Sequence, residues 1–179
     1  MSVKKEAAGR RSVEVDVPGN PQSAAARQSA EAELGTLIAK FAAVNLRLIA
    51  AMRSWLRKRL PTAHEVVYEY ANQGAVVISY SPNERGYEGV LAIRASANGV
   101  RLYFNRGKGL PDPAKLLRGS AKQVRWIDLE GASTLARPEV VRLIDEAIAR
   151  NRVPFANTGR VPVVIRSVST KQPRPRRPA

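Results

Sequence analysis

The stretch from residue 99 to residue 129 constrains the fold more than any other, because it specifies several elements in a fixed order. It reads GVRLYFNRGKGLPDPAKLLRGSAKQVRWIDL. A strand-forming segment leads into two closely spaced glycines, after which Asp112 can cap a short helix that has Pro113 at its first position and Gly119 just past its end. Residues 122–129 then have the composition of a returning strand. We predict strand, glycine-rich turn, short helix and strand as one unit.

The segment that begins at Gln22 has the period of an amphipathic helix. Ser23 or Ser29 can cap it, the weak helix formers at 42–45 predict a break, and Pro61 ends it. We therefore predict either two helices or one kinked helix before residue 61. The apolar residues that recur at spacings of three and four are Leu34, Leu37, Ile38, Phe41, Leu48, Met52, Trp55 and Leu56.

Strand-like segments rich in β-branched and aromatic residues follow this helical region. Pro138 then opens a second amphipathic segment that ends near Asn151. Residues 161–169 are an edge-strand candidate, because Pro162 lacks the N–H of a central strand. This order predicts an α+β two-layer sandwich with N-terminal helices, a five-stranded antiparallel sheet and a C-terminal helix. The five expected strands are residues 64–70, 74–80, 89–96, 100–105 and 122–129.

The charge of the chain is unevenly distributed along its length. The formal net charge is +15, and residues 150–179 contain eight basic side chains and no acidic one. We divide the chain into an N-terminal arm (1–22), one α+β domain (23–151) and a basic, proline-rich C-terminal tail (152–179). A field of this sign attracts polyanions, so nucleic acid, an anionic membrane surface or an acidic partner are the expected partner classes.

The chain contains no cysteine, which excludes disulfides, thiolate nucleophiles and zinc–thiolate sites. Its longest apolar stretch, 37–52, is interrupted by Lys40, Asn45 and Arg47, so we expect no transmembrane segment. The N-terminus lacks the apolar core of a secretory signal. These features together predict a cytoplasmic protein.

Several ordered motifs between about residue 30 and residue 149 resemble one known family. The motifs are HEVVY from His64, YSPNER from Tyr80, LYF from Leu102, LPDP from Leu110, LLRGSAKQVR from Leu116 and LARPEV from Leu135. In order and spacing they are similar to the YdhG-like family, a bacterial domain of unknown function with a frataxin-like fold. One branch of that family is assigned as an intracellular iron chaperone, so the resemblance implies an iron chaperone-like binding protein and iron as a bound metal.

Frataxin-type iron delivery relies on carboxylates along the first helix and first strand, where oxygen ligands suit a labile hard cation. In this chain Glu65 and Glu69 fall on one face of a strand if the period of two holds, whereas His64 points to the other face. Glu65 and Glu69 are therefore the metal-ligand candidates. The alternative is that both are solvent-facing carboxylates in ordinary ion pairs.

The sequence contains no recognisable motif of catalytic residues. Nucleophilic catalysis needs a serine or cysteine beside an orienting base, and general acid–base catalysis needs a perturbed pair of titratable groups. The chain has one histidine and no Gly-x-Ser-x-Gly elbow. We predict a non-enzymatic protein without a resident cofactor.

Glycines and lysines recur on both sides of the expected short helix, at residues 107–109 and 119–122. Free backbone donors and lysines beside glycines can surround an anion, although the spacing is not that of a P-loop. One interpretation is a site for a small phosphorylated ligand, and the alternative is two structural turns. The residues expected to gather around that ligand are Arg106, Lys108, Ser120, Lys122 and Arg125.

Two further groups of basic residues suggest non-specific association with nucleic acid. One group closes the N-terminal helical region, where it either contacts phosphates or complements the C-terminal helix dipole in solvent. The other lies in the proline-rich tail, which is otherwise a solubilising end. A homodimer is a further partner arrangement left open. The two groups are Arg53, Arg57, Lys58 and Arg59 in the helical region, and Arg174, Arg176 and Arg177 in the tail.

Overall fold

The fold was examined in a computed structural model, which describes residues 23–86, 88–159 and 162–167. The N-terminal arm and the tail residues Arg174, Arg176 and Arg177 lie outside the described residues. The elements in chain order are α1 (Ala24–Ile38), α2 (Ala43–Arg59), β1 (His64–Tyr70), the 3-10 turn η1 (Ala71–Gln73), β2 (Ala75–Ser81), β3 (Leu91–Ser96), β4 (Gly99–Phe104), β5 (Arg125–Asp128), the 3-10 turn η2 (Ala132–Ala136), α3 (Pro138–Ala149) and β6 (Val163–Ser167).

The N-terminal helical region forms two helices, and its boundaries follow the sequence signals. The hydroxyl of Ser23 accepts a hydrogen bond from the Ala26 amide at 3.1 Å, so Ser23 is the N-cap of α1. The break between α1 and α2 lies at residues 39–42, slightly before the predicted position. α2 ends at Arg59, two residues before Pro61, and Pro138 begins α3.

The sheet has six strands and is mixed, not five-stranded and antiparallel as predicted. Its order is β5-β4-β3-β2-β1-β6. The first five strands form the expected antiparallel meander, but β6 adds to the free edge of β1 in parallel. β6 begins immediately after Pro162, whose carbonyl accepts the Glu65 amide at 2.9 Å. The missing N–H of this proline therefore limits where the strand starts without preventing the pairing.

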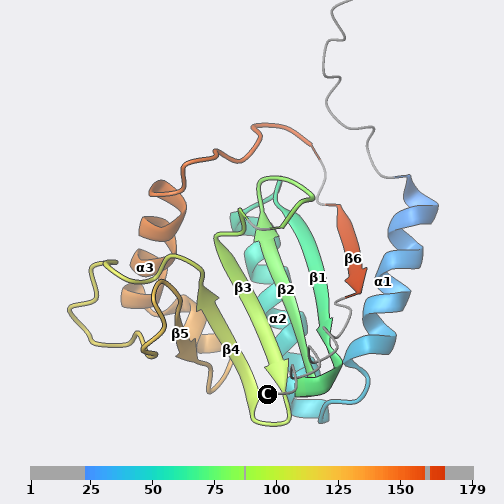
Figure 1. The fold of residues 1–179 in the computed structure, drawn as a ribbon, viewed down its shortest axis with the longest axis horizontal. Helices are drawn as coiled ribbons and strands as arrows, with labels where there is room; N and C mark the ends of the chain where they lie inside the picture. The colour runs from blue at the N-terminus through green and yellow to red at the C-terminus, as the bar shows by residue number, and fades with distance from the viewer. Residues whose placement is uncertain (1–22, 87, 160–161, 168–179) are drawn as a thin grey trace, which may run out of the picture.

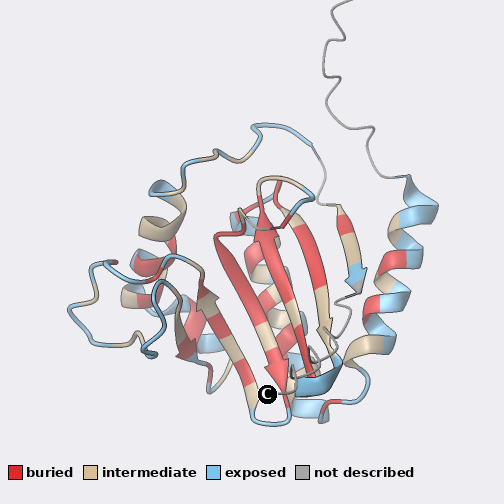
Figure 2. Cartoon of the chain, viewed as in Figure 1, coloured by how far each residue is buried: buried red, intermediate tan, exposed pale blue. Residues whose placement is uncertain are grey.

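One face of the sheet is covered by helices, which confirms the α+β class (Figure 1). α2 crosses behind the central strands, α3 lies behind the β4–β5 side, and α1 flanks β6 at the opposite edge. Buried residues are concentrated on the central strands and on the sides of the helices that face them (Figure 2). The largest fully buried side chains include Tyr80, Phe104, Leu34, Ile49 and Met52.

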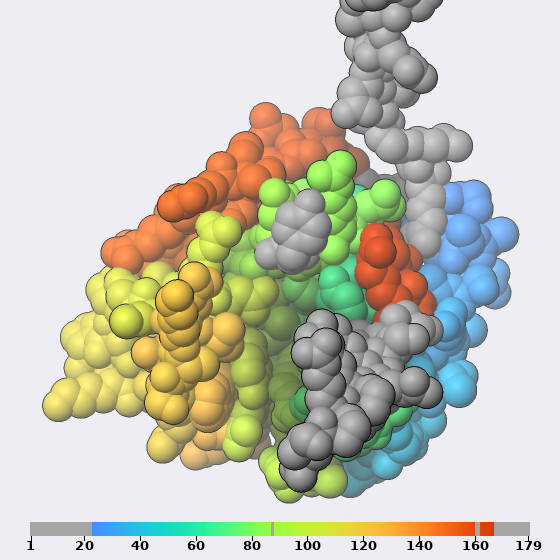
Figure 3. Space-filling model, viewed as in Figure 1, coloured from blue at the N-terminus to red at the C-terminus, as the bar shows by residue number. Residues whose placement is uncertain are grey.

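The connection between β4 and β5 differs from the prediction, because residues 112–119 do not form a helix. Lys115 has a positive φ of 52°, which stops the turn that Pro113 begins. The carboxylate of Asp112 instead accepts the amides of Leu116 and Leu117, at 2.9 and 2.7 Å. The connection is therefore an irregular loop, and it bulges from the side of the molecule remote from α1 (yellow in Figure 3).

The predicted domain boundary at residue 151 does not coincide with the end of regular structure, because β6 lies within the segment expected to be tail. Within the described residues, no helix has the length and apolar character required to cross a membrane.

Candidate functional site

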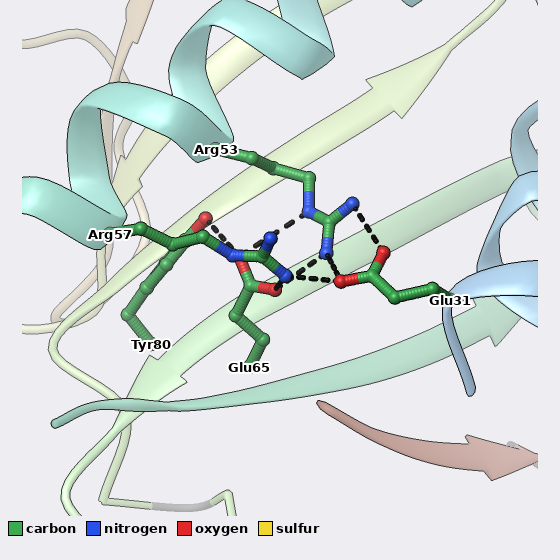
Figure 4. Close-up of polar contacts among 5 residues, drawn as sticks. All are labelled: Glu31, Arg53, Arg57, Glu65 and Tyr80. Atoms are coloured by element: carbon green, nitrogen blue, oxygen red, sulfur yellow. Dashed lines mark hydrogen bonds and ion pairs between the residues drawn. The ribbon is translucent and has the colours of Figure 1, made fainter. Parts of the chain in front are cut away.

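Two guanidinium groups and two carboxylates form an ion-pair network between α1, α2 and β1 (Figure 4). Arg53 and Arg57 are one helical turn apart on α2, so both side chains reach the same place. Glu65 on β1 lies between them, with Oε2 at 2.6 Å from Arg53 Nη2 and at 2.5 Å from Arg57 Nη2. On the other side of the network, the Glu31 carboxylate on α1 accepts hydrogen bonds from both arginines, two of them from Arg53 at 3.0 Å. The network links three elements and balances its own charge.

Burial and charge pairing set the protonation of this network. Glu65 is fully buried, and its Oε1 also accepts the Tyr80 hydroxyl at 2.8 Å. Burial, reinforced by the Glu65 charge, raises the pKa of Tyr80 well above its usual range. Burial opposes ionisation of Glu31, but hydrogen bonds and charge from Arg53 and Arg57 outweigh it and lower the Glu31 pKa. Glu31 and the arginines are therefore charged at neutral pH.

The metal-ligand candidates Glu65 and Glu69 share the helix-facing side of β1, but the structure does not bring them to one site. Glu65 is buried in the network, so the expectation of a solvent-facing carboxylate is wrong for this residue. Glu69 pairs with Lys40 at 2.9 Å and is partly exposed. Among the residues that the structure describes, no three histidine, aspartate or glutamate side chains come together in a metal-binding arrangement.

The basic residues at the end of α2 have divided roles. Arg53 is only 14% exposed, so the expectation that this side chain stays in solvent is wrong, because it is held by Glu31 and Glu65. Arg59 pairs with Asp145 of α3, through an Nε–Oδ1 contact of 3.0 Å. Lys58 is exposed. The four bases therefore do not form one phosphate-facing row.

A second site is a pocket of about 500 Å³ between the β4–β5 loop and the C-terminal end of α3. This volume lies in the range of small-molecule sites. Its described lining contains five basic side chains and no acidic one. Its residues are Gly89, Val90, Arg106, Lys108, Leu110, Lys122, Gln123, Ala147, Arg150, Asn151 and Arg152.

Arg150 differs from the other basic residues of the pocket because it is engaged on both sides. Its Nε donates to Glu146 at 3.1 Å, and its Nη1 donates to the carbonyl of Gly109 at 2.7 Å. It also lies at the C-terminal end of α3, where a cation offsets the partial negative charge of the free carbonyls. Arg150 therefore links the β4–β5 loop to the end of α3.

The remaining four cations of the pocket have no carboxylate partner among the described residues. They are Arg106, Lys108, Lys122 and Arg152. The backbone segments that contain Lys108 and Lys122 lie side by side, because the Lys108 amide donates to the carbonyl of Gln123 at 2.9 Å. All four are exposed, and cations that line one pocket without a carboxylate partner in the described part of the chain produce a positive potential that favours an anionic ligand.

Of the five residues predicted around an anion, the structure brings Arg106, Lys108 and Lys122 into one pocket. Ser120 is exposed and does not line it. Arg125 turns back onto its own loop, donating to the carbonyls of Ala121 and Val124 at 2.6 and 2.7 Å.

The second wall of the pocket, which contributes Arg150 and Arg152, was not predicted from the sequence. Both follow the last turn of α3, and arginines just past a helix end were the only available signal. Their proximity to the β4–β5 loop depends on the packing of α3 behind the sheet, which no local pattern encodes.

His64, the single histidine of the chain, gives a pH-dependent stability. Burial lowers its pKa below the usual value, with Glu84 and the Ser81 backbone opposing the shift. Near pH 6.5 the unfolded chain therefore binds a proton at His64 that the folded chain does not bind. The free energy of unfolding consequently falls as the pH drops through that region. We expect urea unfolding midpoints to decrease between pH 7.5 and 5.5 by more in the wild type than in His64→Gln. Equal decreases in the two proteins would contradict this prediction.

Comparison of the chain with protein-family models, with curated proteins and with solved structures found no match. Inference about function therefore rests on the geometry and charge of the sites described above.

Proposed function

We propose that this protein is a non-enzymatic binding protein, and that the pocket between the β4–β5 loop and α3 takes a small phosphate-bearing ligand. The observation that carries the proposal is the lining itself, which has four cations without a carboxylate partner among the described residues and no acidic side chain. Phosphate oxygens are strong acceptors for such donors, and charge-assisted hydrogen bonds are about twice as strong as neutral ones.

The ion-pair network is a poorer candidate for anion binding, although it contains two arginines. Both guanidinium groups already contact Glu31 and Glu65, so an incoming phosphate would have to displace a carboxylate. The shallow hollow beside it, lined by Ala50, Arg53, Ser54, Arg57 and Lys58, leaves Lys58 as its only cation without a carboxylate partner in the described part of the chain.

Calorimetric titration of the full-length chain with inorganic pyrophosphate tests the proposal. The double variant Lys108→Gln/Lys122→Gln should bind pyrophosphate at least about tenfold more weakly than the wild type, because it loses two charge-assisted contacts. The amide resonances of residues 107–109 and 122–123 should shift on titration in the wild type.

The matched control is Lys58→Gln/Lys115→Gln, which removes the same charge from two exposed lysines outside the pocket. It should retain the wild-type affinity for pyrophosphate. An equal loss of affinity in both double variants would show that the overall positive field, and not the pocket, attracts the anion. The absence of any binding heat in the wild type would end the proposal.

The YdhG-like assignment and a frataxin-like fold remain proposals that rest on the motifs quoted above. The cytoplasmic location is also a proposal, and it rests on the sequence features described with it. An iron chaperone-like role rests on that resemblance alone, and in it Glu65 would have to exchange its arginine partners for the metal. Association with nucleic acid through Arg174, Arg176 and Arg177 concerns residues outside those that the structure describes.

A further inference from the structure

The charge of the pocket lining indicates how many phosphate groups a bound ligand would carry. A phosphate monoester carries roughly −1.5 to −2 charges at pH 7. One such group would leave about half of the four unpaired cations without a counter-charge, whereas two such groups would match them.

The cations also come from two different walls. Arg106, Lys108 and Lys122 belong to the β4–β5 loop, and Arg152 follows α3 on the other side. Arg150 joins these two walls through its hydrogen bonds to the Gly109 carbonyl and to Glu146. A ligand that satisfies both walls has its phosphates separated by a spacer.

The rest of the lining indicates the chemistry of that spacer. Among the residues that the structure describes, no aromatic side chain lines the pocket, and the apolar lining residues Val90 and Leu110 are only 6% and 8% exposed, whereas Ala147 is half-buried. In the described part of the lining, a planar base could therefore stack only on the guanidinium group of an arginine.

Two side-chain amides, those of Gln123 and Asn151, also line the pocket. The Asn151 Nδ2 donates to the Val153 carbonyl at 2.5 Å, which leaves its Oδ1 as an acceptor. The Gln123 side chain has no partner among the described residues and offers both a donor and an acceptor. Amides of this kind suit hydroxyl groups.

We infer that the ligand of this pocket is a small polyhydroxylated compound that carries two separated phosphate groups, of the class of the sugar bisphosphates. This inference rests on the proposed function and specifies its ligand. The loop wall binds one phosphate, Arg152 binds the other, and the amides of Gln123 and Asn151 bind hydroxyl groups between them.

Calorimetric titration of the full-length chain with fructose 1,6-bisphosphate, fructose 6-phosphate, ADP and pyrophosphate tests the inference. The bisphosphate should bind at least about tenfold more tightly than the monophosphate, since it gains a second set of charge-assisted contacts. It should also bind more tightly than ADP, whose two phosphates are directly linked instead of separated by a spacer. In Arg152→Gln the bisphosphate should fall to the affinity of the monophosphate, while pyrophosphate binding to the loop wall stays within about twofold.

The control for the arginine substitution is Arg142→Gln, an exposed arginine of α3 that does not line the pocket and whose loss should leave all four affinities unchanged. Equal affinities for the mono- and bisphosphate, tighter binding of ADP, or tighter binding of a single-stranded oligonucleotide would each overturn the inference. If pyrophosphate binds in any of those cases, the proposed function still stands. If no phosphate compound binds, the proposed function itself fails.

Discussion

Replacing Glu65 by alanine is expected to lower the free energy of unfolding by about 3–5 kcal/mol, because removal of one partner leaves buried charge uncompensated. Arg53 would keep only Glu31, and the Tyr80 hydroxyl would lose its acceptor. Equilibrium unfolding in urea at pH 7, followed by far-UV circular dichroism, measures the change. A loss of this size is a large fraction of the stability of an ordinary domain, which is about 5–15 kcal/mol.

Glu69→Ala is the matched control, since Glu69 lies four residues further along the same face of β1. Its carboxylate is 35% exposed and pairs only with the exposed Lys40, so its loss should cost less than about 1 kcal/mol. Glu65→Gln should cost less than Glu65→Ala, because the amide oxygen can still accept from Tyr80. Similar losses for the alanine variants at residues 65 and 69 would show that burial of the network contributes little.

A methyl group at residue 119 is expected to be the second most costly of these substitutions, at about 2–4 kcal/mol for Gly119→Ala. Gly119 has a φ of +107°, where a residue with a Cβ is strained, and the added Cβ would lie 2.1 Å from Cζ3 of Trp126. Either the indole ring or the loop backbone must move. The same urea titration measures the loss.

Alanine substitutions at two other glycines separate the cost of backbone strain from the cost of the contact with Trp126. Gly109 has a φ of +87° but open space around it, so Gly109→Ala isolates the backbone strain and should cost about 1 kcal/mol. Gly35 lies in α1 with open space around it, and Gly35→Ala should stabilise the protein by about 0.5–1 kcal/mol. If Gly119→Ala costs no more than Gly109→Ala, the contact with Trp126 is easily relieved.

The local elements could be predicted from the sequence because their signals are short-range. The alternation of residues 64–70 gave the bounds of β1, Ser23 caps α1, and Pro138 begins α3. The predicted helix after Asp112 failed although its cap residue was present. The Asp112 carboxylate accepts the amides of residues four and five positions later, and the φ of Lys115 lies outside the helical range. The presence of a capping residue therefore did not determine the conformation of the backbone that follows it.

The sites could be predicted only where their residues lie close in the chain. Lys108 and Lys122 were predicted together from the glycines beside them, and they share one pocket because the strands that flank their loop pair. The burial of Glu65 depends on arginines from α2 that a strand pattern cannot reveal, since an acidic residue in a strand usually indicates a solvent-facing position. Arg152 reaches the pocket only because α3 packs behind the sheet, which is a property of the whole fold.

The pairing of β6 with β1 determines when the domain can be completed during synthesis. β1 emerges from the ribosome about a hundred residues before its neighbour, so one of its edges has no partner until residue 167 has been made. α1, the first described element to be synthesised, packs against that same late strand. A nascent chain that stalls before residue 163 would therefore present both an open strand edge and an undocked helix, which is the condition under which chaperones and aggregation compete with folding.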